Sequence, residues 1–337
     1  MRARGLLGVA AAIVLLALAD WALPQILNRY YLTILVRILV AVLAATSLQL
    51  VNGFTGQFSI GHAGFMAVGA YVSAAFSVYL GAGWLASLAA VLPAGIARLA
   101  YFPLPLLAGG LAASLAGLVV GVPSLRLRGD YLAIATLGFG EIIRIAILNV
   151  DTVGGARGFS LSAPAGVDLR YEGIGVIGAV VALSVFVMAR LVYSAGGLAF
   201  RAVREDETAA EAMGIPTTRV KVEAFVVASF FAGVAGALFA HAEGYVHTNS
   251  FTFVRSFEIV AFVVLGGLGS LTGAALAAAV LTAAPELLRG LGEWRMILYS
   301  LLIIVTMILR PQGLLGSREL SLRWLRPRST AVAGRPG

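Results

Sequence analysis

The stretch GLAFRAVREDETAAEAMGIPTTRVK, residues 197 to 221, decides how the rest of the chain is interpreted. It carries many charged side chains and good helix formers, yet long apolar runs flank it on both sides. A polar, helix-forming loop between apolar runs has to stay ordered outside the lipid, and a soluble partner that docks there would provide the reason. The loop therefore predicts a membrane protein that is driven by another protein rather than a passive pore.

The composition supports this class. Hydrophobic residues make up 60% of the 337 residues and charged residues only 12%, whereas soluble domains are about one quarter charged. The 40 glycines suit close helix packing and broken helices in a membrane. With no cysteine there is no disulfide framework and no thiolate metal site, and no paired zinc ligands appear either, so we expect no metal and no cofactor. The sequence predicts an all-α polytopic membrane protein.

Hydropathy predicts about ten transmembrane helices (eight to ten), some of them broken or short. The candidate spans lie near residues 1–23, 30–51, 58–80, 104–122, 131–149, 174–193, 222–243, 256–267, 268–284 and 294–309. The first resembles a cleavable export signal, but the many later spans favour a retained helix. The span at 256–267 is too short for an ordinary crossing and predicts a broken or tilted helix. Residues 84–101, with Pro93 and Arg98, predict an interfacial or re-entrant segment.

Arginine placement predicts the orientation. Basic residues precede the first span, follow the fourth, surround the loop 194–221 and follow the last span, which places all four groups and both termini in the cytoplasm. The loop 151–173 then lies outside. We interpret the net charge of +8 as topology and lipid headgroup contact rather than nucleic-acid binding. Residues 1–316 are expected to form one transmembrane domain, and residues 317–337 a basic, disordered tail.

Residues Leu198 to Met213 predict one short helix that ends at Gly214. Ala199, Val203 and two later residues recur at roughly helical spacing and form an apolar stripe, and charges fill the other faces. The candidate docking residues are Arg201, Arg204, Glu205, Asp206, Glu207, Ala209, Ala210, Glu211, Met213 and Gly214. The alternative is a solvated surface helix held by its own ion pairs at i,i+4 spacing.

Glycines and small polar residues interrupt two apolar regions, near residues 52–64 and 266–274. Irregular backbone inside a membrane lines a cavity or is buried, and broken helices form substrate sites in transporters. The candidate pathway residues are Asn52, Gly56, Gln57, Ser59, Gly61, His62, Gly266, Gly269, Ser270 and Thr272. A tight loop at the membrane surface is an equal alternative. Aligning Gly53 with Gly266 also matches Gly56 with Gly269, which suggests a two-fold internal pseudo-repeat.

Charges within the spans are functional candidates by default. Glu141 and Arg144 are one turn apart and could pair, and Glu258 lies in a later span. Arg37 could pair locally or reach the headgroups. His241 and Glu243 stand near a helix end and are expected to face the interface.

Catalytic motifs are missing from the sequence. A P-loop needs Gly-Lys-Ser/Thr, but the only lysine, Lys221, stands between two valines. No nucleophile elbow or HExxH motif occurs. We therefore expect a protein that is not an enzyme, and an intramembrane enzyme has no catalytic constellation to support it.

Four runs carry a family resemblance: GFTGQFSIGHAGFMAVGAY, LRLRGDYLAIATLGFGEIIR, FRAVREDETAAEAMGI and ILRPQGLLG. Together they resemble the permease subunit of bacterial branched-chain amino acid ABC transporters, the LivM type, over about residues 30 to 316. The resemblance implies a subunit of an inner-membrane importer that pairs with a second, homologous permease. It also implies two cytoplasmic ATP-binding subunits and a periplasmic substrate-binding protein.

The resemblance further identifies the loop around Arg201–Gly214 as the coupling loop. ABC permeases carry Glu-Ala-Ala-x3-Gly there, and this chain has Thr208 in the place of the glutamate, with Glu207 beside it. The stretch between Tyr71 and Leu125 is long for the family. Alternatives to branched-chain substrates are other amino acids, urea or amides, and a stand-alone secondary transporter or channel is the runner-up class.

Overall fold

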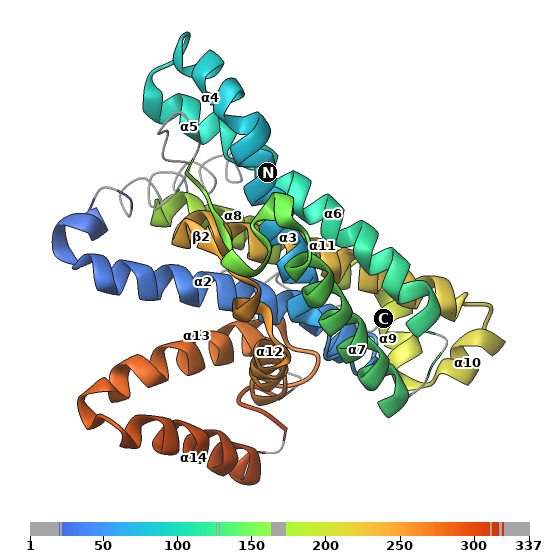
Figure 1. Ribbon diagram of the computed structural model, residues 1–337. Coiled ribbons are helices and arrows are strands. Elements are labelled where there is room, and N and C mark those ends of the chain that lie inside the picture. Colours follow the sequence, from blue (N-terminus) through green and yellow to red (C-terminus); the bar gives the residue numbers. More distant parts are fainter. Residues whose placement is uncertain are drawn as a thin grey trace, which may run out of the picture.

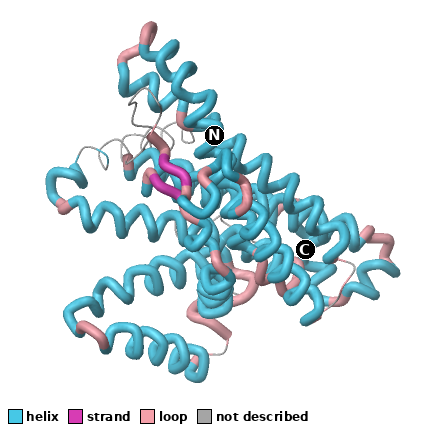
Figure 2. Tube along the Cα trace, viewed as in Figure 1, coloured by secondary structure: helices cyan, strands magenta, loops and turns pink. Residues whose placement is uncertain are grey.

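The computed structural model describes residues 20, 22–125, 127, 129–162, 173–310, 312–316 and 319. The expected first span, much of the 151–173 loop and nearly all of the 317–337 tail lie outside them. Helices make up most of the described chain, and one short two-stranded sheet is the only strand structure drawn (Figure 2).

The elements follow one another along the chain as a series of helices with short connections (Figure 1). They are α2 (Arg29–Gln49), η1 (Leu50–Phe54), α3 (His62–Phe76), η2 (Ser77–Gly81), α4 (Ala82–Ala89), α5 (Ala94–Tyr101), α6 (Pro103–Ser124), α7 (Asp130–Leu148), η3 (Asp151–Val153), η4 (Gly155–Arg157), β1 (Phe159–Ser160), α8 (Ile174–Val192), α9 (Ala195–Glu205), α10 (Glu207–Ala212), α11 (Thr217–Glu243), β2 (Tyr245–Val246), η5 (Thr248–Phe251), α12 (Phe253–Gly266), α13 (Leu271–Leu287), η6 (Leu288–Leu291) and α14 (Trp294–Leu309). Within the described residues, eight helical segments are long and apolar enough to cross a membrane, and the 16-residue α14 is a shorter apolar helix. The predicted all-α polytopic class is confirmed.

The bundle has two distinct ends, which we name by the elements found there. Helices α9 and α10 stand at one end, the α9–α10 end, and the sheet marks the other, the β1–β2 end (Figure 1). In the sheet, Phe159 pairs with Val246 and Ser160 with Tyr245. Successive long helices run alternately between the two ends, so the expected alternation of loops along the chain is present.

Residues 84–101 form two short helices and the turn that joins them. Helices α4 and α5 form a hairpin that extends α3 and α6 at the β1–β2 end (Figure 1). The short span predicted at 256–267 is the 14-residue α12, which follows the 3-10 turn η5 after a break at Thr252. The helical segment Thr248–Gly266 has 19 residues and is long and apolar enough to cross a membrane, so the expectation that this span is too short for an ordinary crossing is wrong.

Glycines set the packing of α3, α6 and α11, the central helices. A side-chain carbon added at Gly109 would lie 2.6 Å from the carbonyl oxygen of Gly69, and one at Gly233 would lie 2.8 Å from that of Gly109. Small residues allow helix backbones to approach this closely, which stabilises membrane bundles through van der Waals contact. Glycine is thus required where these three helices cross.

Both histidines on these helices are buried and bonded to a serine. His62 Nε2 lies 2.7 Å from Ser47 Oγ, and His241 Nε2 lies 2.9 Å from Ser77 Oγ. The expectation that His241 faces the interface is wrong, because the residue is only 1% exposed and Phe102 packs edge-on against its ring. Hydrogen bonds inside the bundle remove the cost of burying these polar rings.

The segment that follows α14 packs back on the turn between α12 and α13. Leu314 donates its backbone N–H to the carbonyl of Leu265 (2.7 Å). Glu319 accepts the backbone N–H groups of Leu271 (2.6 Å) and Thr272 (3.1 Å), the first residues of α13. A carboxylate at a helix N-terminus satisfies free N–H groups and favours the helix dipole. Of the expected disordered tail, Glu319 therefore belongs to the packed bundle.

Candidate functional site

The predicted docking loop folds as two helices instead of one. Ser194 caps α9, and the carboxylate of Asp206 caps α10 by accepting the N–H groups of Thr208 (2.8 Å) and Ala209 (3.0 Å). Aspartate competes well for free N–H groups at a helix start, and Asp206 takes an extended conformation (φ −157°) to do so. The expectation of a continuous helix from Leu198 to Met213 is therefore wrong.

The expected apolar stripe is split by this break. Val203 and Ala210 are buried against the chain's own bundle, so they cannot contact a partner. Leu198 and Met213 are instead 62% and 82% exposed. Helical periodicity reveals that a face is apolar but not which surface covers it.

Several charges of the loop fasten α10 to α11. Lys221 Nζ pairs with Glu207 at 2.5 Å, and Thr217 donates to the Glu211 carboxylate at 2.6 Å. In the part of this region that the structure describes, an ion pair at i,i+4 spacing occurs within α11 (Arg219–Glu223), whereas the pair within α9 joins the neighbouring residues Arg204 and Glu205. The loop is thus held by tertiary contacts and not by its own helix pairs.

The start of α9 is anchored by an aromatic contact. The Arg201 guanidinium lies 5.0 Å from the centre of the Tyr193 ring, and the Tyr193 hydroxyl donates to Glu319 at 2.9 Å. Burial, and then the bond to Glu319, raise the pKa of the Tyr193 phenol, so it remains a neutral donor at physiological pH.

The two glycine-broken segments meet at the α9–α10 end, and Arg204 of α9 contacts both. Arg204 Nη1 donates to the carbonyl of Gly53 at 2.9 Å, and its side chain packs on Gly56 and Gly269. Both of these glycines have positive φ (69° and 91°), where a side chain would be strained. A side-chain carbon at Gly53 would lie 2.7 Å from the backbone N of Gly269, so the segments touch each other directly.

The common position of the two glycine-broken segments explains part of the similarity between their sequences. Each joins two helices that run to and from the same end, α2 to α3 and α12 to α13. The α2 residue Gln49 donates its side-chain amide to the carbonyls of Gly267 (2.8 Å) and Ser270 (3.2 Å). Sequence reasoning missed Gln49 because it stands inside an apolar run. The two-fold repeat itself stays a prediction.

Most of the candidate pathway residues hold the turns. Asn52 closes the first turn with two hydrogen bonds to the backbone of Ser59, and Ser270 caps α13 by accepting from Gly273. The others in this group are Gly61 and His62, packed against α7 and α2, Gly266, packed against Gly273, and Thr272, bonded to Glu319.

Gly56 and Gln57 instead line a cavity of about 200 Å³ at the α9–α10 end. Arg204, Glu207, Lys221 and Asp130 lie on its walls. The buried side-chain amide of Gln57 has no hydrogen-bond partner on either atom within the described chain. Buried amides are rarely left unbonded, so this polar cavity is suited to water or a polar solute. Lys221, the only lysine, was the signal in the sequence that could have pointed here.

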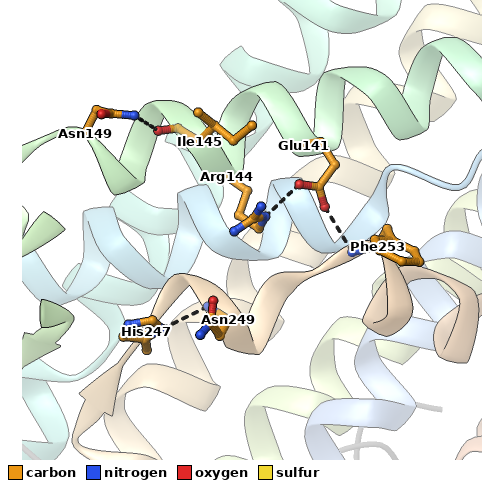
Figure 3. A network of polar contacts seen from close by, with 7 residues as sticks. All are labelled: Glu141, Arg144, Ile145, Asn149, His247, Asn249 and Phe253. Carbon is orange, nitrogen blue, oxygen red and sulfur yellow. Dashed lines mark hydrogen bonds and ion pairs between the residues drawn. The ribbon is translucent and has the colours of Figure 1, made fainter. Parts of the chain in front are cut away.

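The charges within the spans form two local pairs. Glu141 and Arg144 pair at 2.7 Å, as expected, and Glu141 also accepts the backbone N–H of Phe253 at 3.2 Å (Figure 3). Glu258 pairs with Arg255 at 2.5 Å, a partner that sequence reasoning did not name. The same view shows Asn249 donating to His247 beside the pair, in the segment that leads to α12. In the residues that the structure describes, no group of three or more acidic or histidine side chains could hold a metal ion.

Comparisons with known proteins agree over most of the chain. The family described as branched-chain amino acid transport system, permease component, matches residues 30–309. The permease protein LivM of the high-affinity branched-chain amino acid transport system is 37% identical, over 90% of this chain and 74% of its own length in Salmonella typhimurium (strain LT2). LivM of Escherichia coli (strain K12) is also 37% identical, over 93% of this chain and 75% of its own length.

LivH, a permease protein of the same system in Escherichia coli (strain K12), is 27% identical over 82% of this chain and 92% of its own length. No solved structure matches. The match of the family to residues 30–309 and the identity to the LivM proteins lead to one conclusion. The chain belongs to the family of permease components of branched-chain amino acid transport systems.

Proposed function

We propose that the chain is a membrane permease subunit of a bacterial ABC importer in the inner membrane and carries branched-chain amino acids. Separate ATPase subunits power it, and a periplasmic binding protein delivers the substrate. The α9–α10 loop receives the ATPase, and the bundle opens alternately to its two sides. Family membership supports the substrate class, and the matched LivM relatives are named for this transport system.

The observation that carries the proposal is the contact of Arg204. A single side chain on α9 bonds Gly53 and packs on Gly56 and Gly269, so a movement of α9 reaches both glycine-broken turns without an intermediate. Glu205, Asp206, Leu198 and Met213 meanwhile remain exposed on the outer surface of the loop. An ordered, partly apolar surface that is joined directly to the turns between helices is what a docking partner needs in order to move the helices.

The second permease is inferred from the relatives. The matched proteins include both LivM and LivH, two permease proteins named for one transport system. This chain is 37% identical to the first and 27% identical to the second. We therefore propose that it takes the LivM position beside a LivH-like partner.

An uptake assay tests the function against its alternatives. The complete complex, reconstituted in vesicles, is expected to take up labelled leucine only with ATP and the binding protein. Uptake driven by an ion gradient without ATP would show a secondary transporter or channel, the runner-up class. Uptake of urea or another amino acid in preference to leucine would keep the family but change the substrate.

The proposed orientation can be measured directly, because the chain has no native cysteine. Met213→Cys and Val91→Cys place single thiols at positions 82% and 84% exposed, at opposite ends of the bundle. We expect an impermeant maleimide on intact cells to label position 91 and to label position 213 only after the membrane is opened. Labelling of position 213 from outside would reverse the topology and remove the coupling role of the loop.

The docking role of the exposed loop residues has its own test. Met213→Asp is expected to weaken assembly with the ATPase subunits by about tenfold or more, since it puts a charge into an apolar contact without disturbing the bundle. Copurification of the ATPase measures assembly, and total membrane-inserted protein is the reference. Arg219→Asp serves as a control, because Arg219 is exposed and pairs only with Glu223 on its own helix. Normal assembly of Met213→Asp would show that the partner binds elsewhere.

A further inference from the structure

A cavity at the β1–β2 end has a charged centre with different surroundings on its two sides. It lies between α2, α11, α12 and α13, and we call it the Arg37–Glu243 cavity. Its two lobes share Arg37, Val40, Phe239 and Glu243, so they adjoin at this group of residues. One lobe measures about 160 Å³ and the other about 420 Å³. A water molecule needs only about 10–15 Å³ by the same kind of measure, so both lobes admit a larger solute.

The smaller lobe has a mainly apolar wall, and Arg29 and Thr33 also line it. Leu32, Val36 and Ala242 join the shared Val40 and Phe239 along its walls. Val36 is only 7% exposed, so it is part of the packed interior rather than the lipid-facing surface. A pocket of this kind favours a branched or aromatic side chain through the area it removes from water.

The larger lobe is polar. Arg255, Ser250 and Thr282 lie on it, and Arg255 pairs with Glu258. Thr282 carries a buried hydroxyl with no hydrogen-bond partner in the described chain. Threonines in helices usually bond back to a carbonyl one turn earlier, as Thr46 and Thr306 do here. The Thr282 hydroxyl thus has an unused hydrogen-bonding capacity in the wall of the cavity.

The centre is an ion pair that joins two helices. Arg37 Nε on α2 lies 2.8 Å from Glu243 Oε1 on α11, across 206 residues of sequence. The contact uses one nitrogen and one oxygen, so the terminal guanidinium nitrogens and the second carboxylate oxygen make no hydrogen bond or ion pair within the described residues. Arg29, Arg37 and Arg255 line the cavity together with Glu243, and Glu258 pairs with Arg255 beside it. Groups of both signs at one place suit a ligand that itself carries both signs, because each ligand charge then meets an opposite charge in a partly buried place.

From this arrangement we propose that the Arg37–Glu243 cavity binds a zwitterionic amino acid with an apolar side chain on its way through the subunit. The α-carboxylate bonds the guanidinium groups of Arg37 and Arg255, and the ammonium group bonds the Glu243 carboxylate and the Thr282 hydroxyl. The side chain enters the lobe of Leu32, Val36 and Phe239. The proposal rests on the proposed function and adds a site within the permease itself to the recognition expected of a separate binding protein.

Thr282→Val separates a binding role from a structural one. The change keeps the shape of the side chain and removes an unbonded buried hydroxyl, so it should leave the protein equally or more stable to heat. Binding of leucine should nevertheless fall by about tenfold, because a hydrogen bond to a charged group is lost. Thr306→Val is the matched control, since that hydroxyl bonds Leu302 and lies on α14, away from the cavity.

Exchanging the charges of Arg37 and Glu243 tests whether this ion pair binds the ligand. Arg37→Glu combined with Glu243→Arg keeps an ion pair between α2 and α11, so a purely structural pair would work normally. We expect this double variant to assemble but to take up leucine at least about tenfold more slowly, because the charges no longer match a ligand whose side chain must enter the apolar lobe.

The measurements use the complete complex in vesicles for uptake, and the purified permease pair with labelled leucine for binding. Isovalerate and isoamylamine, which carry only the negative or only the positive group, are the competitors and should displace leucine poorly. A wild-type complex that transports no amino acid would overturn the proposed function and this site with it. A wild-type complex that transports leucine while both variants match it would overturn the site alone. Equal competition by isovalerate would also exclude recognition of a zwitterion.

Discussion

Replacing Arg204 with alanine is expected to uncouple ATP hydrolysis from transport. The side chain donates to the Gly53 carbonyl at 2.9 Å and packs on Gly56 and Gly269, so its loss removes the direct connection from α9 to both glycine-broken turns. A hydrogen bond from a charged donor is worth about 1.5–3 kcal/mol, which corresponds to roughly a tenfold to hundredfold change. The amount of leucine carried per ATP should fall by that factor.

The assay compares uptake with phosphate release in the same vesicles. Arg219→Ala removes another arginine of the same loop region that pairs only with Glu223, and it should leave the ratio unchanged. Loss of assembly would instead show that Arg204 holds the loop in place. An unchanged ratio of transport to hydrolysis in Arg204→Ala would mean that the coupling passes through another contact.

Gly233→Ala is expected to disrupt the packing of the whole bundle. The added methyl group would lie 2.8 Å from the Gly109 carbonyl oxygen and 3.1 Å from the Gly110 Cα, and neither backbone can move without displacing α6. Overpacking typically costs about 1–3 kcal/mol, and contact with backbone places this change at the upper end or beyond. The variant should show a lower melting temperature in detergent, or little monodisperse protein.

Gly138→Ala is the matched control for this prediction. It makes the same change in a membrane helix, but nothing lies within 4 Å of the added carbon. Alanine has the better helix propensity by about 1 kcal/mol, so this variant should be equally or more stable. Equal melting temperatures for the two variants would contradict the close approach of α6 and α11.

Local sequence patterns predicted the positions of the helices well, but they predicted poorly which residues the side chains contact. Apolar runs located the spans, and Pro93 with Arg98 marked 84–101 as unusual, because length and composition are local properties. The break at Asp206 had a local signal too, a capping residue before Thr208, but the good helix formers around it outweighed that signal in our reading.

Contacts between distant residues could not be derived in the same way. Arg204 meets Gly53 across 151 residues, and Arg37 meets Glu243 across 206. From the sequence, Arg204 was a candidate for docking a partner, Arg37 could pair locally or reach the headgroups, and Glu243 was expected to face the interface. Only the arrangement of helices brings them to a common place, and that arrangement depends on which glycines pack against each other.

The position of Glu319 has a consequence for biosynthesis. Its carboxylate caps α13, a helix that begins 48 residues earlier at Leu271, and α14 lies between them. During synthesis, α12, α13 and α14 therefore leave the ribosome before Glu319 does. Glu319 is the residue whose carboxylate satisfies the first turn of α13. The first turn of α13 therefore cannot receive this cap until the segment that follows α14 has been synthesised and has folded back onto it.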